Sequence, residues 1–87
     1  MKRDIKLVDR SGADLVRWSQ TNPKILKKII EVIDAIASNP FEGIGKPELL
    51  KHEYKGKWSR RITDEHRIIY AVIDEEIHIY ACFGHYT

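Results

Sequence analysis

The stretch from Pro40 to Tyr70 reads PFEGIGKPELLKHEYKGKWSRRITDEHRIIY, and it decides how the chain is organised. Its first eight residues include Gly43, Gly45 and Pro47. These residues predict a loop, because glycine adopts backbone angles closed to other residues and proline cannot continue a helix. We therefore expect the segment before this loop to form the scaffold and the segment after it to complete a functional site.

Positive charge gathers in the same stretch. The segment from Lys46 to Arg61 carries two acidic side chains against six cationic ones, namely Lys46, Lys51, Lys55, Lys57, Arg60 and Arg61. The rest of the chain holds nine basic and eleven acidic residues, so the formal net charge of +2 conceals a local basic cluster. A polyanion is the natural partner of such a cluster, and a solvated lysine-rich surface is the alternative interpretation.

A helix over residues 23–38 precedes the loop. Asn22 is a good N-cap, and Pro23 fits the first helical position because its missing N–H needs no partner there. Apolar residues then recur at intervals of three and four, at Ile25, Leu26, Ile29, Ile30, Ile33, Ile36 and Ala37. Asn39 and Pro40 end the periodic pattern.

The remaining elements are shorter. Ser11 and Asp14 resemble a capping box at the start of a helix that runs to about Thr21. Strands are predicted at 5–9, 48–52, 58–62, 66–73 and 77–83. An antiparallel sheet with both helices on one face is the simplest way to bury these apolar residues, so the predicted fold class is α+β.

Length and composition bound the function. Eighty-seven residues form one domain, over 1–87, and 43% hydrophobic with 32% charged residues is typical of a soluble globular protein. The lone Cys82 excludes an internal disulfide and suits a reducing compartment. We find neither a signal peptide nor an apolar run long enough to span a membrane, so a cytoplasmic location is expected.

Cofactor chemistry has little support in the sequence. His52, His66 and His78 lack partners at metal-ligand spacing, so no metal site is predicted. The Gly43-x-Gly45 pattern is too short for a dinucleotide or phosphate-binding fingerprint, so no cofactor is expected. His85, in the C-terminal tail, is by itself most simply a surface residue.

A carboxylate, a histidine and arginines on a basic surface can together cleave RNA. In that reaction the ribose 2′-hydroxyl attacks the adjacent phosphorus. The protein supplies a base for the hydroxyl, an acid for the leaving 5′-oxygen and a cation for the charge on phosphorus. DNA lacks the hydroxyl and would be spared.

An ordered set of motifs resembles the YoeB toxins of bacterial toxin–antitoxin modules. The motifs span nearly the whole chain and include NPFEG at 39–43, GKPE at 45–48, WSRRI at 58–62, EHR at 65–67 and the terminal His85-Tyr86. The resemblance implies a RelE-like fold with two N-terminal helices packed on a twisted, antiparallel-rich sheet. It also implies a homodimeric, ribosome-dependent endoribonuclease that cuts messenger RNA and is inhibited by a YefM-like antitoxin.

The same resemblance assigns roles to residues. It implies Glu48 as general base, Arg67 as the cation that stabilises the transition state and His85 as general acid. Lys46, Lys51, Arg61 and Tyr86 are implied to bind RNA. Leu49, Phe83 and Thr87 differ from the usual family pattern, which bears on the grip on RNA and the position of the tail.

Two other functions remain open at this point. One is a gyrase-poisoning toxin like ParE, which binds its target without cutting RNA. The joint presence of Glu48, Arg67 and His85 argues against this function, because a protein that only binds needs no acid–base pair. The other is a non-catalytic RNA-binding or corepressor module.

Strand register offers a structural test of the implied site. Arg67 and His85 can share a face if the last hairpin pairs residues whose numbers have an even sum, as when Ile73 faces Ile77. A two-residue turn at Glu75-Glu76 would pair Asp74 with Ile77 and send the two side chains to opposite faces, unless a bulge or a tail reversal intervenes.

Overall fold

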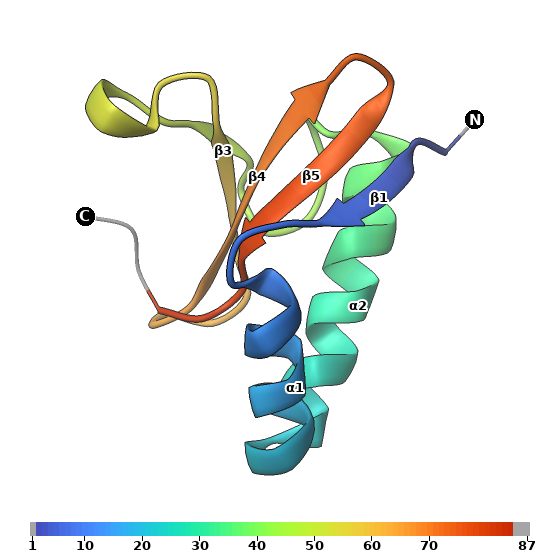
Figure 1. The fold of residues 1–87 in the computed structure, drawn as a ribbon, viewed down its shortest axis with the longest axis vertical. Coiled ribbons are helices and arrows are strands. Elements are labelled where there is room, and N and C mark those ends of the chain that lie inside the picture. The colour runs from blue at the N-terminus through green and yellow to red at the C-terminus, as the bar shows by residue number, and fades with distance from the viewer. Residues whose placement is uncertain (1, 85–87) are drawn as a thin grey trace.

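A computed structural model describes residues 2–84 of the chain. The elements follow the predicted order, as Figure 1 shows, and their bounds are β1 (Asp4–Leu7), α1 (Ser11–Thr21), α2 (Pro23–Ser38), β2 (Glu48–Leu49), the 3₁₀ turn η1 (His52–Tyr54), β3 (Trp58–Arg61), β4 (Arg67–Ile73) and β5 (Glu76–Ala81). The predicted strand at 48–52 is therefore wrong beyond Leu49, because η1 begins at His52, which adopts a φ of 58° outside the strand region.

The two helices begin in different ways. The side chain of Asn22 accepts a hydrogen bond from the Ile25 backbone N–H, which confirms the predicted N-cap of α2. The predicted capping box of α1 is wrong, because Ser11 lies inside the helix and its hydroxyl donates to the Val8 carbonyl at 2.8 Å. The Asp14 carboxylate instead accepts the backbone N–H of Cys82 at 2.8 Å, which ties α1 to the chain after β5.

The five strands form one sheet in the order β1-β5-β4-β3-β2. Four of the strands pair antiparallel, as expected. β1 departs from the predicted antiparallel sheet, since it runs parallel to β5, with Ile5 opposite Ile77. Parallel pairing requires a long crossover between the two strands, and here the helices lie within that connection.

The β4–β5 hairpin has a different register from the predicted one. Ile73 faces Glu76, so neither the Ile73–Ile77 pairing nor a turn at Glu75-Glu76 is correct. Asp74 adopts a φ of 56°, the positive value that a two-residue hairpin turn requires at its first position. The sum of paired residue numbers is therefore odd near the turn.

A bulge then shifts this register. Tyr70 faces Ile79 but Ile69 faces Ala81, so Tyr80 is an extra residue in β5. Beyond the bulge the pair of Ile69 with Ala81 has an even sum. At the end of β4, however, the Arg67 backbone N–H donates to the Gly84 carbonyl at 3.0 Å, and 67 and 84 again have an odd sum. The backbone bond at Arg67 therefore does not have the even parity that the sequence analysis required. His85 itself lies outside the described residues.

The main core lies between the helices and one face of the sheet. Its fully buried members include Ile29, Val32 and Ile36 from α2 and Ile68, Tyr70, Ile77 and Ile79 from the sheet. Burying one isoleucine of this kind contributes about 1.5 to 3 kcal/mol. A smaller cluster of Leu50, Ile69 and Ala81 lies on the opposite face, which we call the open face. The helices thus cover one face and leave the open face for other contacts.

Candidate functional site

Glu48 and Arg67 lie on the open face. Glu48 is opposite Ser59 and Ser59 is opposite Ile69, so all three side chains point to one side of the sheet. Arg67 precedes Ile69 by two residues and therefore points the same way. Two strand spacings and one two-residue step separate Glu48 from Arg67, which gives a Cα separation of about 12 Å. That distance leaves room for a substrate group between a carboxylate and a guanidinium.

Arg67 has an unsatisfied donor. Its Nε is buried and has no hydrogen-bond partner within residues 2–84. Most buried polar atoms in proteins have a partner, because burying a donor without one is unfavourable. Guanidinium groups bind the oxygens of carboxylates and phosphates with directed hydrogen bonds. An anionic oxygen is therefore the ligand that suits this position best.

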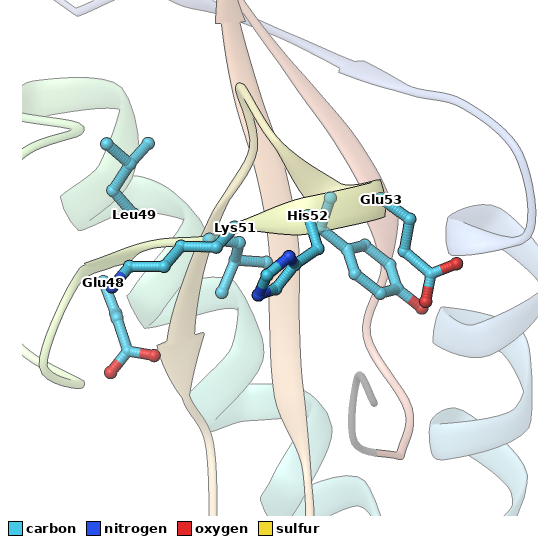
Figure 2. A pocket seen from close by; sticks show the side chains of 7 residues that line it. Glu48, Leu49, Lys51, His52 and Glu53 are labelled. Carbon is cyan, nitrogen blue, oxygen red and sulfur yellow. The ribbon is translucent and has the colours of Figure 1, made fainter.

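Glu48 and its neighbours line an exposed hollow of about 580 Å³, which residues 48–54 form. Figure 2 shows the Glu48 carboxylate and the Leu49 side chain pointing in opposite directions from β2. In the same view the Lys51 side chain runs back toward Glu48. Leu49 is 54% exposed and points away from the side of β2 that carries the Glu48 side chain. The departure at Leu49 thus lies on the side of β2 opposite to Glu48.

The loop before β2 is held in place by Arg60. This arginine is fully buried, and it donates hydrogen bonds to the carbonyls of Ile44 (3.3 Å), Glu42 (2.9 Å) and Asn39 and to the Tyr70 hydroxyl (3.1 Å). A Cβ on Gly43 would come within 3.1 Å of its Nη1, so glycine permits the close approach. One buried side chain therefore fixes the loop that leads to Glu48.

The role of Arg60 could not be read from the sequence, which counts it in the basic cluster. Arg60 lies on the helix-covered face with Ile68 opposite, and its charge is shielded from solvent. Lys46, Lys51 and Arg61 are exposed, as an RNA-binding role requires. Arg61 faces Arg67 directly across the β3–β4 pair, so two cations are adjacent on the open face. Both arginines pair with β4, and the sheet face on which each side chain lies distinguishes Arg61 from Arg60.

Several contacts hold the start of the tail. The Phe83 ring lies 4.9 Å from Trp18 and 4.6 Å from His66 between centroids, and the Arg17 guanidinium lies 3.6 Å above it. The Gly84 backbone N–H donates to Nδ1 of His66 at 2.9 Å. The departure at Phe83 thus adds an aromatic anchor at the end of β5. His85, Tyr86 and Thr87 follow directly and lie outside the described residues.

Cys82 is unsuited to catalysis. Burial raises the pKa of its thiol to about 12, so the nucleophilic thiolate is scarce at neutral pH. Its side chain belongs to the main core. Within residues 2–84 we find no group of three or more His, Cys, Asp or Glu side chains that could hold a metal ion. No helix in this range is long and apolar enough to cross a membrane.

Known structures share this architecture. The RelBE2 toxin–antitoxin complex from Mycobacterium tuberculosis is 18% identical to the chain, with a TM-score of 0.74 over 98% of this chain and 100% of that one. At this identity the likeness shows the fold alone. The α+β domain with two helices on a mostly antiparallel sheet is thus a RelE-like fold.

Sequence similarity is higher to YoeB-like toxins. The family described as the YoeB-like toxin of bacterial type II toxin–antitoxin systems matches residues 8–86. Toxin YoeB of Escherichia coli K12 is 51% identical over 78 residues, which cover 90% of this chain and 93% of that protein. The chain therefore belongs to the family of YoeB-like toxins.

Solved structures agree with this assignment. A YoeB/ParE toxin from Agrobacterium tumefaciens is 36% identical, with a TM-score of 0.92 over 95% of this chain and 99% of that one. YoeB from Staphylococcus aureus is similar both as a dimer (40% identity, TM-score 0.88) and in a YoeB–YefM complex (41% identity, TM-score 0.87), each over 99% of this chain and 100% of that one.

Proposed function

We propose that this toxin is a ribosome-dependent endoribonuclease that cleaves messenger RNA through the ribose 2′-hydroxyl. The observation that carries the proposal is the buried Nε of Arg67, which has no hydrogen-bond partner among residues 2–84 and belongs to a side chain on the same sheet face as Glu48. We assign the Arg67 guanidinium to the phosphate and Glu48, on the same face of the sheet, to the attacking hydroxyl. Membership of a toxin family supports a nucleic-acid target for the exposed cations around these two residues.

The proposed reaction is a transesterification. Glu48 takes the proton of the 2′-hydroxyl, whose oxygen attacks phosphorus, and Arg67 stabilises the charge that develops on the phosphoryl oxygens. His85 gives a proton to the 5′-oxygen as the P–O bond breaks, which leaves a 2′,3′-cyclic phosphate and a 5′-hydroxyl. The three side chains supply all the required groups, so the scheme needs no metal ion.

The remaining partners follow from the relatives. We assign Lys46, Lys51, Arg61 and Tyr86 to contacts with RNA, with the ribosome presenting the message to the open face. The Staphylococcus aureus YoeB structures support inhibition by a YefM-like antitoxin and assembly as a homodimer. A cytoplasmic site of action follows from a ribosomal target.

Purified protein added to translating ribosomes tests the proposal. Mapping messenger 3′ ends should reveal discrete, codon-dependent cuts. In single turnover on preformed complexes, Glu48→Gln and His85→Gln should each slow cleavage by about 10² to 10⁴ while ribosome binding survives. Glu31→Gln is the matched control, because Glu31 is an exposed carboxylate on α2.

Two results would contradict the proposal. Intact messages together with inhibited supercoiling would favour the gyrase-poisoning function instead. Near wild-type cleavage by folded, saturating His85→Gln protein would mean that another group protonates the leaving oxygen.

A further inference from the structure

A second hollow on the open face lies beside Arg67. It has a volume of about 430 Å³, and its lining includes Tyr54, Lys57, Tyr80 and Gly84. Its apolar part is the small cluster of Ile69 and Ala81, each 7% exposed, against which both tyrosines pack. The volume falls in the usual range for small-molecule sites, about 300 to 1,000 Å³. The hollow is thus large enough for one planar ring.

The β5 bulge creates this hollow. Tyr80 is the extra residue, so both it and Ala81 lie on the open face, where regular alternation would send one of them into the core. Bulges of this kind redirect side chains and are frequent next to active sites. The bulge therefore also places the Tyr80 ring on the open face, against Ile69 and Ala81.

A lysine lies against the Tyr80 ring. The Lys57 Nζ lies 4.3 Å from the centroid of Tyr80, in a cation–π contact. The Lys57 backbone N–H donates to the Tyr54 carbonyl at 3.0 Å, so the turn after η1 holds these two residues together. Arg10 and Asp9 also line the hollow, and Arg10 donates a 2.7 Å hydrogen bond to the Phe83 carbonyl and forms an ion pair with Asp14 at 3.6 Å. A lysine beside an aromatic ring suits an anionic ligand that has a flat face.

The hollow is adjacent to the proposed site of reaction. Ile69 follows Arg67 by two residues on the same face, a step of about 6.8 Å along the strand. Gly84 connects the two places, since it lines the hollow and its carbonyl accepts the Arg67 N–H. A nucleotide that adjoins a phosphate at Arg67 can therefore reach the Ile69 side of the hollow.

We propose that this hollow is a subsite in which the base of a nucleotide next to the scissile phosphate stacks on Tyr80, with Lys57 holding the neighbouring backbone. The subsite rests on the proposed RNA cleavage and adds a binding determinant to it. Single-stranded RNA is commonly bound in this way, by aromatic faces beside cations, and stacking tolerates different bases because every base has a flat face.

Two substitutions at Tyr80 separate the ring from mere bulk. Tyr80→Phe keeps the flat face and should retain wild-type behaviour. Tyr80→Leu keeps apolar contact with Ile69 but cannot stack, and it should weaken binding to ribosomes carrying message by about 5- to 150-fold. Leu7→Ala, an exposed apolar residue outside the hollow, is the control, and thermal unfolding checks that each variant folds.

An abasic message identifies the ligand. When the nucleotide next to the scissile phosphate lacks its base, wild-type binding should fall by the same factor as Tyr80→Leu, and Tyr80→Leu should lose nothing further. Equal losses for both proteins on the abasic message would overturn the subsite. Unchanged cleavage and RNA binding by Tyr80→Leu with weakened antitoxin binding would also overturn it, by assigning the hollow to a protein partner. Absence of cleavage by wild type would overturn the proposed function, and the subsite with it.

Discussion

Replacing Arg60 by methionine tests how the loop that carries Glu48 is held. Methionine keeps an unbranched apolar side chain but removes the guanidinium that binds three loop carbonyls and the Tyr70 hydroxyl. Leaving a buried carbonyl without a donor costs about 1 to 3 kcal/mol. Removing a buried cation recovers several kcal/mol of desolvation, which offsets part of that loss. We expect Arg60→Met to lower the free energy of unfolding by about 2 to 4 kcal/mol.

Urea unfolding measures this change, and native-state hydrogen exchange locates it. The Arg61 backbone N–H donates to the Gly45 carbonyl at 2.6 Å, so its protection reports on loop attachment and should drop in Arg60→Met. Arg60→Lys should recover little, because a single ammonium cannot reproduce the fork of a guanidinium. Arg61→Met is the matched control, since Arg61 is exposed and should stay within about 0.5 kcal/mol of wild type. An equally small effect of Arg60→Met, with Arg61 protection intact, would refute the reasoning.

Three further predictions concern the backbone, pH and salt. Gly45→Ala should destabilise the protein by about 1 to 3 kcal/mol, because the φ of Gly45 is 84° and a Cβ would lie 2.8 Å from the Arg61 carbonyl oxygen. In the control Gly12→Ala, in α1, the added Cβ meets no atom within 4 Å and should be neutral or stabilising, so equal unfolding midpoints for the two variants would contradict the prediction. Burial raises the pKa of Cys82 from 9.0 to about 12, so the stability that its neutral thiol contributes is complete below pH 9.0 and declines as pH rises toward 12. The unfolding temperature of Cys82→Ala should therefore fall less than that of wild type at alkaline pH, and parallel plots of unfolding temperature against pH would count against the prediction. Lys51→Ala and Arg61→Ala should each reduce the slope of log binding constant for RNA against log salt concentration by about 0.7, and Lys24→Ala is the control. Unchanged slopes in both variants would mean that neither residue contacts RNA.

Local sequence signals predicted most of the fold. Asn22 and Pro23 gave the start of α2 because capping and the missing proline N–H act within one turn. The four antiparallel strands followed from apolar segments separated by polar turns. Leu49 and His52 show the limit of such reasoning, because positive φ at His52 ends β2 early and no alternation pattern encodes it.

Features that depend on tertiary contacts were not predictable. The bulge at Tyr80 joins the register set by the tight turn at Asp74 to the pairing of Ile69 with Ala81, which local sequence does not reveal. Arg60 and Arg61 are adjacent and chemically identical, yet one is buried beneath the loop and the other is exposed beside Arg67. Resemblance to a family assigned Glu48 and Arg67 to one site. The sheet register then placed them on one face. That the Arg67 Nε has no partner in the described part of the chain emerged from the structure alone.

The most direct test of RNA cleavage by this toxin uses a message with one 2′-deoxynucleotide at the cut position. Ribosomes bind and decode such a message, but the attacking hydroxyl is missing at that phosphate. With saturating wild-type protein in single turnover, we expect cleavage there to disappear, while an all-ribose message gives a 2′,3′-cyclic phosphate end. Cutting at the deoxynucleotide at an undiminished rate would show that another nucleophile attacks the phosphate, and would contradict the role given to Glu48.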